Sequence, residues 1–254
     1  MKEKWRYLKT EDKTAYANMA IDRAVLVANS ECKVSPTVRF FTWNPPAISI
    51  GYFQSLEDEV NLEMCKNIGV DYVRRITGGG AVYHESELTY SIVIPESHPQ
   101  VPKNIMESYG RICGAVIKGL KNLGINSNYI PVNDIIADGK KISGNAQTRK
   151  LKTVLQHGTI LTDVDVNKMF LLLKVPDEKI KDKLIADVKQ RVTSIKHILG
   201  DDINFNETAK AMKAGFEEEF NVDLVEGQLT SYEKELAKRF EIEFFGSKQW
   251  NHRR

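Results

Sequence analysis

The sequence lacks the features that mark secreted, membrane-spanning and nucleic-acid-binding proteins. It has three cysteines, Cys32, Cys65 and Cys113, and their spacing is unpaired, which argues against a disulfide framework and against a zinc site. It has no long apolar run and no apolar leader, so we predict neither a transmembrane helix nor a secretory signal. A net charge of only +2, without a basic cluster, argues against a nucleic-acid partner. We therefore expect a soluble, cytoplasmic protein with no membrane and no nucleic acid among its partners.

The apolar residues, in contrast, are numerous enough for one large domain. Their share of 42% supports a substantial core, so we expect residues 1–254 to form a single domain. Asn104 and Asn206 are predicted to cap the starts of two helices, and Gly69 and Gly124 to follow the ends of two. The patterning predicts strands at residues 5–8, 38–43, 47–50, 70–73, 88–94 and 154–162, and helices at residues 13–28, 62–67, 104–123, 166–173, 177–189, 206–220 and 232–240.

The most informative stretch is Arg-Arg-Ile-Thr-Gly-Gly-Gly-Ala-Val-Tyr-His at residues 74–84. Its three glycines lie between two predicted strands, which excludes both the common phosphate loop and the dinucleotide fingerprint, since each of these precedes a helix. Glycines permit positive φ and let a ligand approach the backbone closely, and Arg74 or Arg75 could grip a phosphate or carboxylate. The alternative is a flexible hairpin whose arginines face water. Thr77 and His84 favour a binding site over that alternative.

A second informative stretch, residues 133–146, contains Asp138-Gly139 between two apolar runs, which predicts a two-residue hairpin. The implied register places Ile135 opposite Ile142, and it places Asp134, Lys141 and Ser143 on one face with Asp134 diagonal to Lys141. The alternative is an exposed cross-strand salt bridge. The small residues that follow, Ser-Gly-Asn-Ala, favour a place where the backbone meets a ligand. Lys140 is expected to point away, toward water.

With both stretches read, the sequence resembles the lipoate–protein ligase family, in the superfamily that also holds biotin–protein ligases and octanoyltransferases. The resemblance rests on residues 74–84, Asn-Asp at 133–134, Gly-Lys-Lys-Ile-Ser-Gly-Asn-Ala at 139–146 and His-Gly-Thr at 157–159, and it extends over roughly residues 5–250. It implies an α+β fold, in which a mixed, largely antiparallel β-sheet is flanked by helices. It also implies ATP-dependent activation of lipoic acid to lipoyl-AMP, and transfer of the lipoyl group to one lysine of a carrier domain.

The resemblance assigns roles to particular residues. Lys141 resembles the catalytic lysine, and Asp134 the residue near a Mg²⁺ ion. Tyr83 and Tyr90 are candidates either for the wall of a lipoyl tunnel or for ordinary core packing. The residues implied to bind lipoyl-AMP or ATP are Arg75, Thr77, Gly78, Gly79, Gly80, Ala81, His84, Asn133, Asp134, Ser143, Gly144, His157, Gly158 and Thr159.

The implied cofactors are ATP and Mg²⁺, with lipoic acid as substrate and no permanently bound group. The implied partners are lipoyl domains of 2-oxoacid dehydrogenase acyltransferase subunits or the glycine cleavage H protein. Ligases of this family usually carry a further C-terminal domain, which is not found in this sequence, so a separate accessory subunit is expected.

Three alternatives remain open at this point. The chain could be an octanoyltransferase that moves octanoyl from acyl carrier protein to a lipoyl domain, a lipoyltransferase that uses preformed lipoyl-AMP, or a non-catalytic module that binds carrier domains. Octanoyltransferases that work through a thioester carry a cysteine in the loop before the Asn-Asp pair, and residues 126–132 contain none. Cys113 falls within a predicted helix and is expected to be a core residue. On this ground the sequence favours the ligase.

Overall fold

The larger of two β-sheets forms the centre of the molecule. The computed structural model describes residues 2–175 and 181–253. The strand order is β11-β1-β2-β6-β10-β9-β8-β7, and every neighbouring pair is antiparallel except β11–β1 and β1–β2. This confirms the predicted mixed, largely antiparallel sheet. The strands are β1 (Glu3–Lys13), β2 (Thr37–Trp43), β6 (Glu87–Pro95), β7 (Asn128–Ile130), β8 (Asp134–Ala137), β9 (Lys140–Lys150), β10 (Thr153–Leu161) and β11 (Val222–Glu226).

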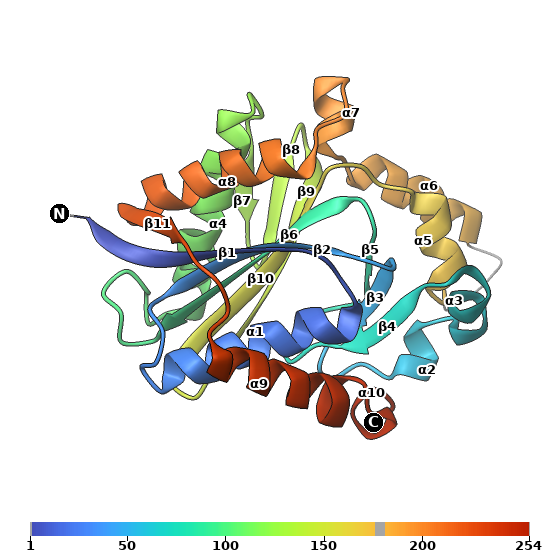
Figure 1. The fold of residues 1–254 in the computed structure, drawn as a ribbon. Helices are drawn as coiled ribbons and strands as arrows, with labels where there is room; N and C mark the ends of the chain where they lie inside the picture. Colours follow the sequence, from blue (N-terminus) through green and yellow to red (C-terminus); the bar gives the residue numbers. More distant parts are fainter. Residues whose placement is uncertain (1, 176–180, 254) are drawn as a thin grey trace.

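A smaller sheet carries the glycine-rich stretch. It has the order β4-β3-β5, in which β3 (Ala47–Ile50) pairs in parallel with β4 (Asp71–Arg74) and antiparallel with β5 (Val82–His84). The three glycines lie between β4 and β5, as the sequence predicts. Figure 1 shows this small sheet beside the end of the larger one, next to α2 (Leu56–Glu59), α3 (Leu62–Ile68) and α5 (Val166–Leu172).

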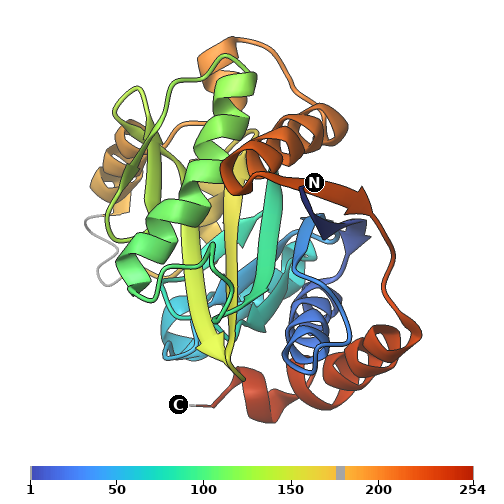
Figure 2. The same ribbon diagram turned by 90° about the vertical axis from the view of Figure 1, so that its left-hand side faces the viewer.

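Two pairs of helices cover opposite faces of the large sheet (Figures 1 and 2). One face packs against α4 (Ile105–Asn122) and α8 (Phe205–Phe220), with Phe216 at the centre of that core. The other packs against α1 (Ala15–Ser30) and α9 (Ser231–Phe240), around Phe41 and Trp43. The remaining helices are α6 (Lys181–Arg191), α7 (Ile195–Leu199), the π-helical turn η2 (Glu241–Phe245) and α10 (Lys248–Asn251).

The central strands β6 and β10 are buried almost end to end because helices cover them on both faces. Polar side chains on these two strands therefore lie inside the protein. They need partners there, since an unpaired buried polar group is costly. Glu87, Thr89, Ser91 and His157 are such residues, and each is at most 8% exposed. Their partners form the site described below.

Most helix ends follow the predicted signals. The Asn104 side chain accepts hydrogen bonds from two N–H groups in the first turn of α4, and Gly69 and Gly124 have positive φ after α3 and α4. The predicted cap at Asn206 is wrong: Asn204 caps α8, and Glu207 completes a capping box with it. The predicted helix at residues 177–189 begins outside the described residues, and α6 accounts for its second part.

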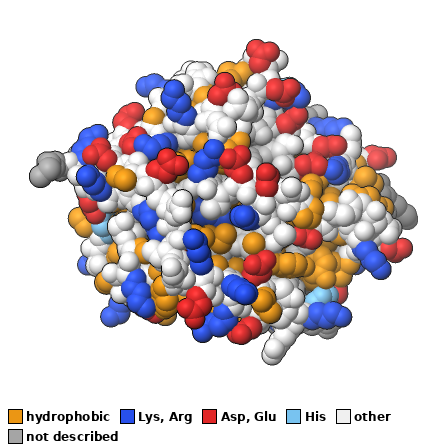
Figure 3. Space-filling view, viewed as in Figure 1, with side chains coloured by type: hydrophobic (Ala, Val, Ile, Leu, Met, Phe, Trp, Pro, Cys, Tyr) orange, Lys and Arg blue, Asp and Glu red, His pale blue; other side chains and the backbone are white. Residues whose placement is uncertain are grey.

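The surface is ordinary for a globular protein. Figure 3 shows lysine, arginine, aspartate and glutamate side chains interspersed across one face, as the small net charge leads us to expect. No helix in the described part of the chain is long and apolar enough to span a membrane.

Candidate active site

The glycine-rich loop at residues 75–81 is held against the end of β3. A Cβ on Gly51 would lie 1.9 Å from the carbonyl oxygen of Gly79, so only glycine at position 51 allows the loop to approach this closely. The N–H of Tyr52 donates to the carbonyl oxygen of Thr77 at 2.8 Å. Gly79 itself has φ of +97°, a conformation that residues with a side chain rarely adopt. The backbone of the loop is therefore fixed in place and exposes Gly79 and Gly80 to the cavity beside it.

The guanidinium groups of both arginines before the glycines donate to backbone carbonyls, and of the two only Arg75 lines the cavity, so Arg74 is not placed to grip a ligand there as the sequence allowed. Arg74 is 1% exposed, and its guanidinium donates to backbone carbonyls of residues 51–54 and 250–253. Arg75 donates to the carbonyl oxygens of Gly78 and Gly80 at 2.8 Å each and to Ser49. Burial lowers the pKa of Arg75 to about 10, which leaves it protonated at neutral pH. Arg74 thus anchors the C-terminal segment, and Arg75 braces the loop.

The hairpin formed by β8 and β9 places Lys141 beside the cavity. Its Nζ lies 2.7 Å from Oδ1 of Asp134, so the predicted contact between these two side chains is confirmed. A Cβ on Gly144 would lie 2.9 Å from Cε and 3.0 Å from Nζ of Lys141, so the small residue leaves room for the lysine to lie across the strand. Lys141 and Gly144 both line the cavity.

The predicted register of this hairpin is correct at Ile136–Lys141 and wrong beyond it. A bulge at this point pairs Ile135 with Ser143 and Asp134 with Gly144. A bulge adds one residue to a strand and re-aims the side chains that follow it. Ser143 is consequently fully buried and does not line the cavity, whereas the sequence placed it on the face of Lys141.

A cavity of about 180 Å³ joins the two informative stretches of the sequence. Residues of the glycine loop and Lys141 both line it. The predicted site residues that line it are Arg75, Gly79, Gly80, Ala81, His84, Asn133, Lys141, Gly144, His157, Gly158 and Thr159. Four predicted residues, Thr77, Gly78, Asp134 and Ser143, do not line it.

Other cavity-lining residues were not predicted from the sequence. Met19, Trp43, Ser49 and Thr89 come from elements outside the two informative stretches, whereas Val82, Asn145 and Ala146 lie within those stretches but were not named as site residues. Tyr83 and Tyr90, the candidates for a tunnel wall, do not line the cavity. Tyr90 is buried in the core against Phe216, and burial raises its pKa well above the ordinary value.

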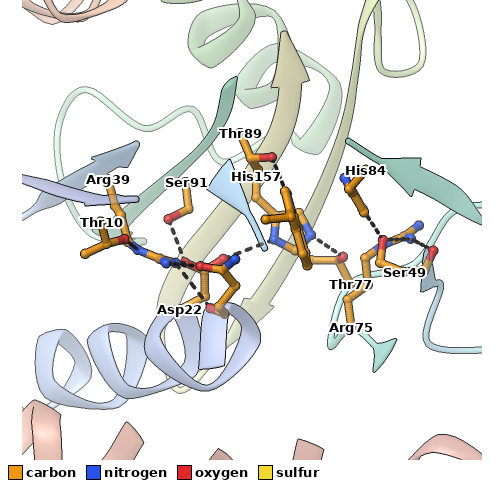
Figure 4. A network of polar contacts seen from close by, with 12 residues as sticks. Thr10, Asp22, Arg39, Ser49, Arg75, Thr77, His84, Thr89, Ser91 and His157 are labelled. Atoms are coloured by element: carbon orange, nitrogen blue, oxygen red, sulfur yellow. Dashed lines mark hydrogen bonds and ion pairs between the residues drawn. The ribbon is translucent and has the colours of Figure 1, made fainter. Parts of the chain in front are cut away.

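His84 is the central member of a row of hydrogen bonds at the cavity wall. Its Nε2 lies 2.7 Å from Oγ of Ser49, and its Nδ1 lies 2.6 Å from Oε1 of Glu87. The ring of Trp43 stacks on the imidazole, with centroids 4.0 Å apart and planes 14° from parallel. Thr89 donates to the same Glu87 oxygen at 2.6 Å and accepts from Nε1 of Trp43 at 2.8 Å. Figure 4 shows His84, Ser49 and Arg75 side by side in this row.

His157 belongs to a second, deeper network that reaches the helix α1 (Figure 4). Its Nε2 lies 2.7 Å from Oγ1 of Thr77, and its Nδ1 lies 3.3 Å from Oδ2 of Asp22. Asp22 forms a buried ion pair with Arg39 at 2.7 Å and accepts from Ser91 at 2.8 Å. Burial lowers the pKa of His157. The pKa of Asp22 is also lowered: burial, the largest influence, would raise it, but His157, Arg39 and Ser91 outweigh that effect. This network holds Thr77, and with it the start of the glycine loop.

The described residues contain no cluster that could hold a metal ion, and no cysteine among them lines the cavity. No group of three or more histidine, cysteine, aspartate or glutamate side chains in residues 2–175 and 181–253 could hold a metal ion. The carboxylate of Asp134, the predicted Mg²⁺ ligand, faces the ammonium of Lys141, so this residue by itself does not make a metal site. Cys113 is buried in α4 next to Gln156, and burial raises the pKa of its thiol to about 12. It does not line the cavity and is a core residue, as predicted.

The chain matches a known family along most of its length. Residues 14–217 match the family model described as "Lipoyl protein ligase A/B catalytic domain". It is 38% identical over 275 residues to a curated protein of Brevibacillus brevis named "Octanoyltransferase LipM", and the match covers 99% of this chain and 100% of that protein. A protein of the same name from Bacillus subtilis is 33% identical, and the match covers 100% of this chain and 99% of that protein.

Solved structures with the same fold carry ligase names. A bi-partite lipoate protein ligase from Thermoplasma acidophilum superposes with a TM-score of 0.88 at 29% identity, covering 98% of this chain and 96% of that one. Lipoate-protein ligase A bound with ATP gives a TM-score of 0.83 at 28% identity, covering 99% of each chain.

The curated relatives correct one expectation from the sequence. The predicted activity, ATP-dependent ligation of lipoate, is wrong by this comparison, since the full-length relatives at 33–38% identity are named octanoyltransferases. The ligase structures are less similar in sequence, at 28–29% identity. The sequence favoured the ligase because residues 126–132 contain no cysteine, the residue that thioester-forming octanoyltransferases carry in that loop.

Proposed function

Because the chain belongs to the lipoyl protein ligase A/B catalytic domain family, an enzyme family, we propose that it is an octanoyltransferase. It would take octanoyl from the thioester of acyl carrier protein and pass it to the ε-amine of a lysine on a lipoyl domain. The observation that carries the proposal is the cavity between the glycine loop and Lys141, in a chain whose full-length relatives are named octanoyltransferases.

The shape and lining of the cavity suit a short aliphatic chain. Its apolar wall is made by Met19, Trp43, Ala81, Val82 and Ala146. Burial of a methylene group against such a wall contributes about 0.8 kcal/mol. The cavity volume of about 180 Å³ leaves room for a single narrow chain.

The polar end of the cavity offers groups for the transfer step. When an amine attacks the acyl carbonyl carbon, negative charge develops on the carbonyl oxygen, and donors fixed in place beforehand stabilise it. The Lys141 ammonium is one such group. The N–H groups of Gly79 and Gly80 are two others, because they donate to no other group in the part of the chain that the structure describes. Asp134 orients the lysine through their ion pair.

A second candidate donor is a preformed acyl-adenylate, which would make the chain a lipoyltransferase. The observation that favours it is chemical: none of the described cavity-lining residues is a cysteine, and an adenylate donor does not require one. The use of ATP and Mg²⁺ and the need for a separate accessory subunit remain predictions from the sequence. No step of the proposed transfer passes through them.

The two donors are distinguished by measuring initial rates of acylation of a lipoyl domain. Octanoyl acyl carrier protein and synthetic lipoyl-adenylate are supplied in separate reactions without ATP, and product is quantified by intact-protein mass spectrometry. The octanoyltransferase proposal expects the larger kcat/KM with octanoyl acyl carrier protein. If the enzyme acylates the lipoyl domain with lipoyl-adenylate and not with octanoyl acyl carrier protein, the octanoyltransferase proposal is rejected in favour of the lipoyltransferase.

A further inference from the structure

A serine, a histidine and a glutamate stand in line at the cavity wall. We propose that the octanoyl group is carried transiently as an ester on Ser49, that His84 is the general base for this step, and that Glu87 is the residue that positions His84. The proposal rests on the proposed octanoyltransferase function, and it names a covalent acceptor for the acyl group in a cavity whose described lining has no thiol.

The distances match those of a nucleophile, its base and an orienting carboxylate. Oγ of Ser49 lies 2.7 Å from Nε2 of His84, and Nδ1 of His84 lies 2.6 Å from Oε1 of Glu87. An ionised carboxylate only accepts hydrogen bonds, so Glu87 assigns the ring proton to Nδ1 and leaves Nε2 free to accept the serine proton. Ser49 and His84 both line the cavity where the acyl chain would lie.

The surroundings of this row fix its geometry. Trp43 stacks on the imidazole, and Thr89 holds the carboxylate oxygen that His84 uses. The second oxygen of Glu87 is buried without a hydrogen-bond partner among the described residues. A buried carboxylate in this situation favours positive charge on the neighbouring ring, which is the charge that His84 acquires when it takes the serine proton.

Arg75 adds a donor at the nucleophile. Its Nη1 lies 3.0 Å from Oγ of Ser49 and 2.9 Å from the carbonyl oxygen of the same residue. A guanidinium at this distance stabilises the developing alkoxide as the proton leaves. The arginine is itself held by the loop carbonyls, so its position does not depend on the substrate.

A second row of a hydroxyl, a histidine and a carboxylate in this protein is a poorer candidate for the acyl-carrying site. Thr77, His157 and Asp22 are also hydrogen-bonded in sequence. Both hydroxyl residues are almost fully buried, but Ser49 lines the cavity and Thr77 does not, so the cavity gives a thioester access to the serine and not to the threonine. Cys113 is excluded by the same criterion. Of these three residues, Ser49 alone lines the cavity, and its hydroxyl is hydrogen-bonded to a histidine that can act as its base.

The proposed reaction has two steps, and atoms and protons balance in each. In the first, Oγ of Ser49 attacks the thioester carbonyl carbon, its proton passes to Nε2 of His84, the C–S bond breaks and His84 returns the proton to the departing thiolate of acyl carrier protein. In the second, the neutral ε-amine of the carrier lysine attacks the ester, the C–O bond breaks, and the amine proton passes through His84 to Oγ. The sum converts a thioester and an amine into an amide and a thiol.

The ester is detected by mixing the enzyme with octanoyl acyl carrier protein in the absence of a lipoyl domain, quenching with acid, digesting and sequencing peptides by mass spectrometry. We expect one octanoyl group on the peptide that contains Ser49. Ser49→Ala should lose this adduct and lower the rate of transfer to a lipoyl domain by about 10³-fold or more, as for nucleophiles in comparable arrangements. Cys113→Ala, the matched control, should keep both.

Two further variants separate chemistry from folding. Ser49→Cys conserves size and nucleophilicity, so it should carry a thioester that neutral hydroxylamine cleaves, whereas the wild-type ester survives that treatment. Glu87→Gln should lower kcat with little change in KM, because it acts through His84 and not on the substrate, and Glu87→Asp should recover part of kcat. A purely structural role of Glu87 would instead lower the melting temperature and leave kcat of the folded fraction unchanged.

The outcomes also separate this proposal from the proposed function. If folded Ser49→Ala transfers octanoyl within a few-fold of the wild-type rate, or if the adduct lies on another residue, the serine ester is rejected and the octanoyltransferase function stands. If wild-type enzyme does not use octanoyl acyl carrier protein at all, the function itself is rejected. Should Ser49→Ala fail to fold, the Ser49→Cys thioester decides: its presence supports the proposal and its absence overturns it.

Discussion

Replacing Lys141 by methionine separates its contribution to catalysis from its contribution to stability. Methionine keeps much of the aliphatic stem and removes only the ammonium. The side chains of Lys141 and Asp134 are 41% and 36% exposed, so water reaches both residues, although Oδ1 of Asp134 is itself buried. Pairs of this kind contribute about 0–1 kcal/mol to the free energy of unfolding. We therefore expect the variant to unfold at nearly the wild-type denaturant concentration.

The effect on the transfer step should be much larger. Lys141 is a charged group in the lining of the cavity, and removal of one donor to a developing oxyanion lowers kcat by roughly 10²–10³-fold, or about 2.7–4 kcal/mol. The loss should appear in kcat more than in KM, because the charge that Lys141 stabilises is absent from the ground state.

The assay is octanoyl transfer to a lipoyl domain, followed over time by intact mass, with chemical denaturation measured on the same preparation. Lys140→Met is the matched control: it removes the same charge from the neighbouring residue, which does not line the cavity. A Lys141→Met enzyme as fast as the Lys140→Met enzyme would refute the role of Lys141. A Lys141→Met protein that is strongly destabilised would refute our reading of its ion pair.

Four further predictions concern the loop, the deeper network and the buried thiol. Gly51→Ala places a Cβ 1.9 Å from the carbonyl oxygen of Gly79, so we expect a loss of about 1–3 kcal/mol of stability in urea titrations and a raised KM, and wild-type values for both would count against the close approach. Gly79→Val combines φ of +97° with a contact 2.8 Å from Arg75, and calorimetric titration with a non-hydrolysable octanoyl thioester should show no binding. Burial lowers the pKa of His157 below 6.5, so as pH falls below about 6.5 the unfolded chain takes up a proton that the folded chain does not, and the free energy of unfolding falls by up to ~1.4 kcal/mol per pH unit. Urea titrations from pH 8 to pH 5.5 should show a shallower fall for His157→Asn, and an unchanged slope would contradict the shift. Cys113→Ala should transfer octanoyl at the wild-type rate, and an inactive, folded variant would revive a thiol mechanism.

The sequence predicts much of this fold because local signals agree with the final packing. The glycines at 78–80 lie between strands, and Asn104 and Gly124 bound α4. The strand β11 was missed, however, because its pairing partner β1 is at the opposite end of the chain and no turn signal joins them. Parallel pairing of distant segments leaves no local signature in a sequence.

The candidate site was predicted in part. Lys141 and the glycine loop do line one cavity, and Asp134 does contact Lys141. The bulge that turns Ser143 away could not be predicted, because Ser143 and Gly144 both fit a regular strand. Likewise, the sequence shows that Arg74 and Arg75 are charged, but it does not show that their guanidinium groups donate hydrogen bonds to backbone carbonyls.

The Ser49–His84–Glu87 row illustrates a different limit. A histidine followed three residues later by a glutamate is visible in the sequence, and it could have drawn attention to residues 84–87. Ser49 comes from another strand, and only the pairing of β3 with β5 brings it beside His84. The spacing of His84 and Glu87 within one segment is visible in the sequence, whereas the contact of His84 with Ser49 on another strand is visible only in the structure.

The proposed octanoyltransferase moves an octanoyl group from acyl carrier protein to a lysine without nucleotide. The direct measurement is the mass of a lipoyl domain after incubation with this enzyme and octanoyl acyl carrier protein, in a reaction treated with apyrase to remove ATP. We predict a gain of one octanoyl group, located on the carrier lysine. An unmodified lipoyl domain in that reaction, together with acylation only when ATP and free acid are added, would contradict the claim.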